Sequence, residues 1–301
     1  LLKTSLKDDK EQIRIQALHS VISQTEASRY IPQIKYMIKN ETNEKVKREA
    51  VNTLAKIGGS ETVAFFKKNL EEAGDSFLKY YIVNALERVN PSTAIPMLIA
   101  LYKATRNMEL RNSVIDVMGK YTTSDGTSGL KELLFLEEKD NLEQSRKNKE
   151  RILNTFIKID PSESLAIYKK ILTLKVGNPD PNDRYKKSLE QEYVWLKLHT
   201  VRLLAGVPNK AGYPVIVDII NDSIETDSGG NIPGAKQRIR LAAIELLANL
   251  KIAEVKPKLK EMFLSSNDSY ESYSIRRALI NNGEDGPTLD ALKKRHDAEQ
   301  R

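Results

Sequence analysis

Three sets of polar and aromatic residues recur in this chain at a spacing typical of one helical repeat, and their side chains are suited to binding an extended ligand. The first set, here called the amide row, is built mainly from asparagines. An asparagine amide both donates and accepts hydrogen bonds, so a row of amides matches the backbone of an extended peptide. The alternative is that any small polar residue suits an exposed helix face. The amide row comprises Asn52, Asn84, Asp116, Asn154 and Arg202.

The second set, the basic row, follows four residues after members of the amide row. Four cations in successive repeats predict a positive edge beside the amides. The alternative is that a cation in the last turn of a helix gains roughly 0.3–1 kcal/mol from the helix dipole, whatever binds nearby. The basic row comprises Lys56, Arg88, Lys120 and Lys158.

The third set adds aromatic surface three residues before the amide row. It comprises Tyr81, Arg151 and His199, together with Trp195 one helical turn before His199. Trp195 is the only tryptophan of the chain, and large aromatic rings are frequent anchors in interfaces. The alternative for Trp195 is partial burial under the long loop of its own repeat.

The helices that position these sets are marked by a basic residue that recurs every 32 to 48 residues, here called the basic ladder. A self-similar pattern with this period indicates stacked helical repeats. Apolar residues stand one position before seven of the eight ladder residues and, with few exceptions, three, four and seven positions after them, which places them on one face of a helix. The three sets above fall on the opposite, free face. The basic ladder comprises Arg14, Lys47, Lys79, Arg111, Lys149, Lys197, Arg240 and Arg276.

A second helix precedes each ladder helix, and its start is marked by proline, which fits the first turn of a helix without loss of a hydrogen bond. Pro32, Pro96, Pro214 and Pro257 predict such starts, and Gly58-Gly59, Asn90-Pro91, Asp160-Pro161 and Gly283 predict helix ends. Residues 288–301 predict a closing helix with Leu289 and Leu292 facing inward. Leu1, Leu2 and Leu6 resemble the last turns of a helix, so we expect the first repeat to be truncated at its N-terminus.

Composition narrows the class of protein. The chain has 301 residues, 40% of them hydrophobic, and no cysteine. We expect one continuous domain, no disulfide, no thiolate site and no membrane insertion, because no apolar run approaches roughly 18 residues. The net charge of +7 permits an anionic partner, but 41 acidic residues are mixed among 48 basic ones. The composition is that of a soluble chain, either cytoplasmic or exported.

Cofactor and catalytic motifs were sought by their spacing. Asp180 and Asp183, in an insertion over residues 175–187, could contribute to a calcium site, but the EF-hand pattern is absent. A second insertion covers residues 222–237. The sequence has no phosphate-binding glycine loop, no G-x-S-x-G and no H-E-x-x-H. We therefore expect no cofactor, no metal and no enzymatic activity.

Taken together, these features resemble the HEAT-repeat superfamily along essentially the whole chain. They are a proline near the start of the first helix, a short acidic turn, the pattern apolar-basic-x-x-small-apolar-x-x-apolar and a terminal glycine, and they are cleanest from Asn43 to Gly58. The resemblance implies an all-α, right-handed alpha-alpha superhelix, a solenoid of about eight helical hairpins whose second helices line a concave groove. It also implies that the basic ladder bonds the acidic turns and keeps the repeats in register. Asn148 in an apolar position and Gly283 at the last core position depart from the pattern.

Some helical-repeat proteins are enzymes, notably the HEAT-like DNA glycosylases and the bilin lyases. Asp116 is the acid in the amide row, but Asn112 stands where the resemblance would place a tryptophan. We therefore expect a protein-binding scaffold that holds an extended protein segment in the groove of repeats two to six. The alternative is a nucleic-acid-binding or DNA-repair solenoid that uses the same groove.

Overall fold

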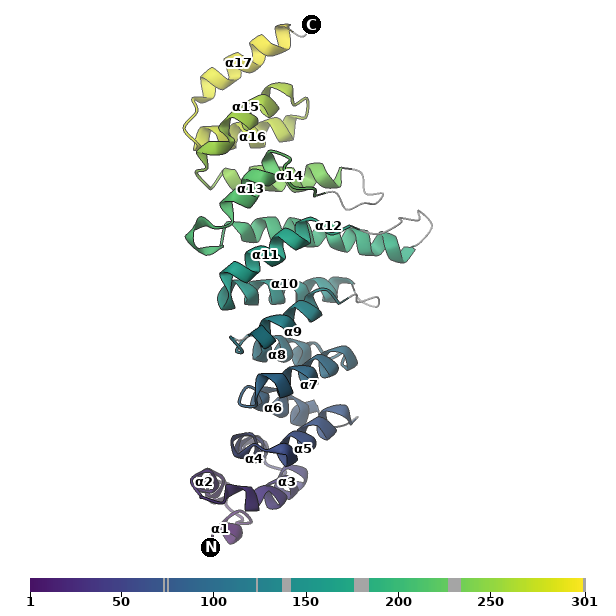
Figure 1. Cartoon of the computed structure of the whole chain (residues 1–301), viewed down its shortest axis with the longest axis vertical. Helices are drawn as coiled ribbons and strands as arrows, with labels where there is room; N and C mark the ends of the chain where they lie inside the picture. The colour runs from purple at the N-terminus through teal and green to yellow at the C-terminus, as the bar shows by residue number, and fades with distance from the viewer. Residues whose placement is uncertain are drawn as a thin grey trace. The chain divides into compact units, whose positions relative to one another are not determined.

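The computed structural model describes residues 1–72, 74, 76–122, 124–136, 142–175, 184–226 and 234–299. Over these residues the chain forms α-helices and short 3-10 helices, with no β-strand. The all-α prediction is therefore confirmed. The helices divide into two compact units, Leu1–Leu136 and Glu137–Arg301, and each is considered by itself (Figure 1). The single continuous domain stays a prediction.

The first unit has two layers of helices. The ladder helices α2, α4, α6 and α8 pack one on the next, and α3, α5, α7 and α9 do the same beside them. Hairpins join the layers, because α3 packs on α4, α5 on α6 and α7 on α8. The helices of this unit are α1 (Leu2–Ser5), α2 (Glu11–Ile22), α3 (Ile31–Asn40), α4 (Glu44–Ile57), α5 (Ser60–Glu71), α6 (Ser76–Leu86), α7 (Pro91–Ala104), α8 (Met108–Met118) and α9 (Ser124–Leu134), with a 3-10 turn at Ala27–Tyr30.

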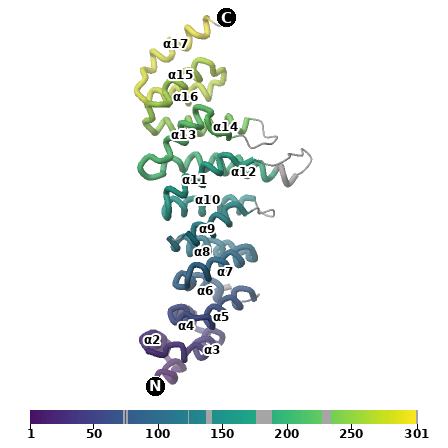
Figure 2. Tube along the Cα trace, in the orientation of Figure 1, coloured from purple at the N-terminus to yellow at the C-terminus, as the bar shows by residue number. Residues whose placement is uncertain are grey.

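The second unit repeats this arrangement with longer ladder helices. Here α10, α12, α14 and α16 pack in succession, while α11 packs on α12, α13 on α14 and α15 on α16. Figure 2 shows the chain passing from one hairpin to the next within each unit. The helices are α10 (Leu142–Ile159), α11 (Pro161–Leu172), α12 (Arg184–Leu204), α13 (Tyr213–Ile220), α14 (Ala235–Leu247), α15 (Lys256–Ser265), α16 (Ser269–Asn281) and α17 (Gly286–Glu299), with 3-10 turns at Pro208–Lys210 and Ala253–Val255.

The core lies where the apolar stripe of the ladder helices predicts it. Residues seven positions after the ladder residue are fully buried in seven repeats: Val21, Leu54, Leu86, Met118, Phe156, Leu204 and Leu247. The residues three positions after the ladder residue are buried in all eight repeats. Among the residues four positions after the ladder residue, Ile280 in the last repeat is the exception, because it is 40% exposed. Within the described residues no further ladder helix covers that side of α16, and the prediction that Ile280 is buried is wrong.

Three of the four proline starts are confirmed, since Pro32, Pro214 and Pro257 each lie in the first turn of a helix. Pro96 is wrong as a start. It lies inside α7, which begins at Pro91 because the side chain of Asn90 accepts a hydrogen bond from the Ser92 amide at 3.0 Å. The end of α4 at Gly58-Gly59 is confirmed, with φ angles of 71° and 84° that favour glycine.

The predicted closing helix is α17, and its docking face differs in part from the prediction. Leu289 is buried, but Leu292 is 44% exposed, so the inward position of Leu292 is wrong. The docking face instead uses polar contacts. Arg276 binds Asp290 through two hydrogen bonds of 2.7 and 2.9 Å. Lys293 donates to the carbonyls of residues 264 and 266, both at 2.7 Å, and so caps the end of α15.

Candidate functional site

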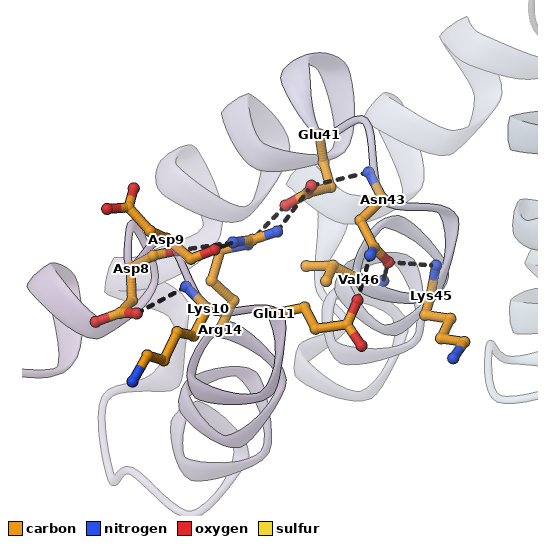
Figure 3. A network of polar contacts seen from close by, with 9 residues as sticks. All are labelled: Asp8, Asp9, Lys10, Glu11, Arg14, Glu41, Asn43, Lys45 and Val46. Atoms are coloured by element: carbon orange, nitrogen blue, oxygen red, sulfur yellow. Dashed lines mark hydrogen bonds and ion pairs between the residues drawn. The ribbon is translucent and has the colours of Figure 1, made fainter.

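The charged groups of the basic ladder form bonds within the fold, so they are not candidates for ligand binding. Arg14 on α2 donates to both carboxylate oxygens of Glu41, at 2.9 and 3.1 Å, and Glu41 belongs to the turn before α4 (Figure 3). The same guanidinium donates to the carbonyls of Asp8 and Asp9 in its own turn, at 2.7 and 3.0 Å. One side chain therefore ties two repeats together, as the resemblance implies.

Other ladder residues make contacts of the same kind. Lys197 is fully buried and donates to the carbonyl of Thr226 at 2.8 Å, while Arg111 donates to the carbonyl of Thr105 at 2.9 Å. The remaining pairs are Lys47 with Glu44, Lys149 with Glu192, Arg240 with Asp222 and Arg276 with Asp290. The prediction that the ladder is structural is thus confirmed for these residues. It is not confirmed for Lys79, whose side chain makes no such contact with a described residue.

In the first unit, the predicted binding residues lie at equivalent turns of three consecutive ladder helices. Helix α4 carries Asn52 and Lys56, α6 carries Tyr81 and Asn84, and α8 carries Asp116, while Arg88 and Lys120 lie in the turns that directly follow α6 and α8. The members of the basic row are exposed, as is Asp116, while the two asparagines and the tyrosine are half-buried. Because α4, α6 and α8 pack in succession, the structure brings this half of each row onto one set of neighbouring helices.

Several of these side chains already bond within the fold. The amide of Asn84 donates to the carbonyl of Tyr80 at 2.8 Å, and the acid Glu87 pairs with both Arg88, at 2.9 Å, and Lys120. Burial, followed by a hydrogen bond with Glu44, raises the pKa of Tyr81. Sequence reasoning missed Glu87, although it directly precedes Arg88. Its carboxylate lowers the positive charge of the basic row to a large extent.

Aromatic surface on α6 is larger than predicted. Phe77 is 66% exposed and Tyr80 is 43% exposed, and the rings of Tyr80 and Tyr81 meet edge to face with centroids 6.3 Å apart. Phe77 was missed, but it stands four residues before Tyr81, so a helical face through Tyr81 and Asn84 includes it. The surface of α6 therefore combines rings, an amide and a cation.

In the second unit, the predicted residues lie on α10 and α12. Arg151, Asn154 and Lys158 on α10 are exposed, as is Arg202 on α12, while Trp195 and His199 are half-buried. The Trp195 and His199 rings are stacked, with centroids 5.3 Å apart and an angle of 11° between their planes.

The stack is also covered from α10. The guanidinium carbon of Arg146 lies 5.7 Å from the centre of the Trp195 ring, so a cation from the neighbouring helix shields part of the indole. Burial lowers the pKa of His199, against the nearby Glu150, which raises it, while Arg202 lowers it further. The imidazole is therefore neutral at neutral pH, and its Nε2 atom is buried with no hydrogen-bond partner in the described part of the chain.

Between α10 and α12 lies a buried polar network that explains the position of Asn148. Asn148 is 1% exposed and accepts a hydrogen bond from Gln144 at 3.0 Å. Beside it, Ser145 donates to Glu192 at 2.8 Å, and Lys149 forms a close ion pair with the same carboxylate. The departure of Asn148 from the apolar pattern was the signal of this network, but its partners on α12 were not predicted.

Metal and membrane sites were considered for the described ranges only. There, no group of three or more His, Asp or Glu side chains is placed to hold a metal ion. Asp180 and Asp183 lie outside the described residues, as does the tip of the second insertion. No helix in the described ranges has the length and apolar character needed to cross a bilayer.

Comparison with known proteins does not assign the chain to a family. No protein-family model matches it, and no curated protein matches it. Among solved structures, the crystal structure of an engineered protein is similar over 86% of this chain and 97% of its own, with 14% sequence identity and a TM-score of 0.27. A TM-score this low does not establish a common fold, so the fold rests on the helices described above.

Proposed function

We propose that this chain is a non-enzymatic binding scaffold of the HEAT-like class, in which the free faces of the ladder helices hold an extended segment of another protein. The repeats in each unit are proposed to stack as a right-handed superhelix. The HEAT-like pattern of the sequence and the two-layer packing of helix hairpins support this class.

One observation carries the proposal. The ladder helices bury the residues at three and seven positions after the ladder residue, yet the positions at nine are exposed in every repeat. Core packing therefore explains the first set of positions but not the second, of which Arg88 and Lys120 pair with Glu87 within the fold. Amides and rings on this free face match the two requirements of an extended peptide, which are hydrogen bonds to its backbone and apolar contact with its side chains.

Electrostatics favours a protein over a nucleic acid. A nucleic-acid surface needs cations that are free to neutralise several phosphates. Glu87 forms ion pairs with two of the three cations of the basic row in the first unit, and the exposed face also carries Asp116. A polypeptide tolerates this mixture of charges, whereas a phosphate backbone is repelled by the acids.

The test is site-specific photo-crosslinking from the face itself. A benzoylphenylalanine replaces Lys56 on α4 or Lys158 on α10, because both are exposed and neither forms an ion pair with a described residue. Matched controls place the same probe at the exposed Lys68 on α5 and Lys169 on α11. A protein captured from the ladder helices and not from the controls supports the proposal, and equal capture at all four sites contradicts it.

Affinity measurements on the captured partner complete the test. The triple variant Asn52→Ala, Asn84→Ala, Asn154→Ala is expected to bind at least about tenfold more weakly, because each amide contributes about 0.5–1.5 kcal/mol through hydrogen bonds. A Lys68→Ala, Lys169→Ala variant serves as the control and should bind normally. A steep loss of binding with added salt, together with capture of nucleic acid, would favour the alternative function.

A further inference from the structure

In the first unit, the ladder contact that joins neighbouring repeats is complete at Arg14, whereas the turn before α8 has no acid in the corresponding position. In the complete form, Glu41 caps the end of α3, accepts from Arg14, and also accepts from the amide of Asn43 at 2.9 Å (Figure 3). The equivalent position after α7 is Thr105. The Thr105 hydroxyl makes the hydrogen bond that corresponds to the one between Glu41 and Asn43, because it accepts from the amide of Asn107 at 3.1 Å. Thr105 has no negative charge that could pair with Lys79, the ladder residue of the preceding helix pair.

Among the described residues, Lys79 is consequently a half-buried cation without an acceptor. It forms no ion pair and no hydrogen bond with its side chain among the described residues, whereas the seven other ladder residues all have partners. Asp75, which directly precedes α6 in the sequence, lies outside the described residues. A cation beside a hollow with apolar walls attracts an anion more strongly than a cation on an open surface does.

Lys79 lines a hollow of about 850 Å³ between α5 and α7. Apolar side chains of both helices form most of its wall, and Pro96, Ala100 and Ala104 present a small-residue surface on α7 that is exposed. The remaining wall residues are Val63, Lys67, Leu70, Glu71, Thr93, Met97, Leu101, Thr105 and Arg106. Three cations thus surround an apolar hollow that contains one acid, Glu71, which lies 3.9 Å from Lys67.

The seam between α5 and α7 also lacks the ion pairs of its neighbours. Lys35 on α3 pairs with Glu61 on α5 at 2.7 Å, and Lys103 on α7 pairs with Glu132 on α9 at 2.7 Å. Helix α7 contains no acidic residue, so a pair with its lysine on α5 and its acid on α7, in the order of the two neighbouring seams, cannot form here. The hollow, the unpaired lysine and the open seam coincide at one place.

We propose that this hollow is a second binding site, distinct from the free faces of the ladder helices, and that its occupant is a short segment of another protein with a carboxylate next to apolar side chains. The carboxylate takes the place that Glu41 has beside Arg14 and pairs with Lys79. The apolar side chains cover Pro96 and Ala100. The excess of positive charge around the hollow selects an acidic segment over a basic one.

The experiment uses a random twelve-residue peptide library displayed on phage, selected on the whole chain, with affinities of the synthetic peptides measured by fluorescence anisotropy. The expected peptides carry an acid beside apolar residues. Lys79→Met is expected to weaken their binding roughly tenfold or more, because a charge-assisted hydrogen bond is lost. Ala100→Trp, which fills the hollow, should abolish binding, and Lys68→Met on the exposed part of α5 is the matched control.

A fourth variant, Thr105→Glu, tests the reasoning independently of folding defects. It restores the acid of the Glu41 type, so it should raise the melting temperature by pairing with Lys79 and at the same time prevent peptide binding. Peptides without an acid, unchanged affinity in Lys79→Met or Thr105→Glu, or failure to enrich any peptide would overturn the proposal. Self-association that Ala100→Trp abolishes would also overturn it, since the occupant would then be a second copy. Unchanged peptide affinity in the triple asparagine variant separates this site from the ladder-helix faces.

Discussion

The buried ion pair between Lys149 and Glu192 provides the most demanding prediction about stability. Its two side chains are 5% and 3% exposed, and they join α10 to α12 in the second unit. Removal of one partner leaves the other as a buried charge, which typically costs about 3–5 kcal/mol. Replacement of Lys149 by methionine keeps an unbranched side chain that is one atom shorter and removes the ammonium group.

The magnitude follows from what remains around Glu192. The hydroxyl of Ser145 still donates to this carboxylate at 2.8 Å, so the lower end of the range, about 3 kcal/mol, is expected for Lys149→Met. A unit of this size loses about 2–4 °C in melting temperature for each kcal/mol. The melting temperature of the second unit should therefore fall by about 6–12 °C, measured by circular dichroism, with urea unfolding as an independent estimate.

Two further variants test whether the loss comes from the buried charge. Lys149→Met combined with Glu192→Leu removes both charges, and it should recover most of the loss because apolar side chains of similar size replace buried pairs at little cost. Lys158→Met is the same substitution at an exposed position of α10 and should change stability by less than about 0.5 kcal/mol. A loss below about 0.5 kcal/mol in Lys149→Met would refute the reasoning, since it would mean that water reaches Glu192.

Three other predictions address α17 and two titrating side chains. Leu289→Ala should destabilise the second unit by about 2–4 kcal/mol in urea unfolding, and Leu292→Ala, at the exposed neighbouring position, by much less. Burial and the nearby Glu87 raise the pKa of Tyr121 from 10.0 to about 12, so its contribution to stability is complete below pH 10 and is lost as the pH rises toward 12. Tyr121→Phe should remove that alkaline loss in melting curves recorded across this range. The lowered pKa of His199 acts in the opposite sense: its contribution is present above pH 6.5 and is lost as the pH falls through the folded-state pKa. NMR titration of the imidazole should give a value below 6.5, and a value above 6.5 would contradict the burial of His199.

The candidate site was predictable to the extent that it depends on helical periodicity. The members of the basic row all proved exposed, because a position nine residues after the ladder residue lies off the buried stripe by geometry alone. The charge of that row was not predictable. Glu87 pairs with its sequence neighbour Arg88 and, between the turns that follow α6 and α8, with Lys120. The second contact depends on how two helices approach each other.

The sequence by itself determined the helical class, the identity of the core positions and the structural use of the basic ladder. These features are local, because a period of 3.6 residues within a helix and a recurring repeat between helices are both written along the chain. Only the tertiary structure decided which local exceptions matter. Pro96 reads as a helix start until Asn90 is seen to cap α7 earlier, and Leu292 reads as buried until Asp290 and Lys293 are seen to form the docking face. Lys79 reads like every other ladder residue until it is found beside the same hollow as Thr105, because periodicity along the chain does not show which residue of another hairpin lies next to a side chain.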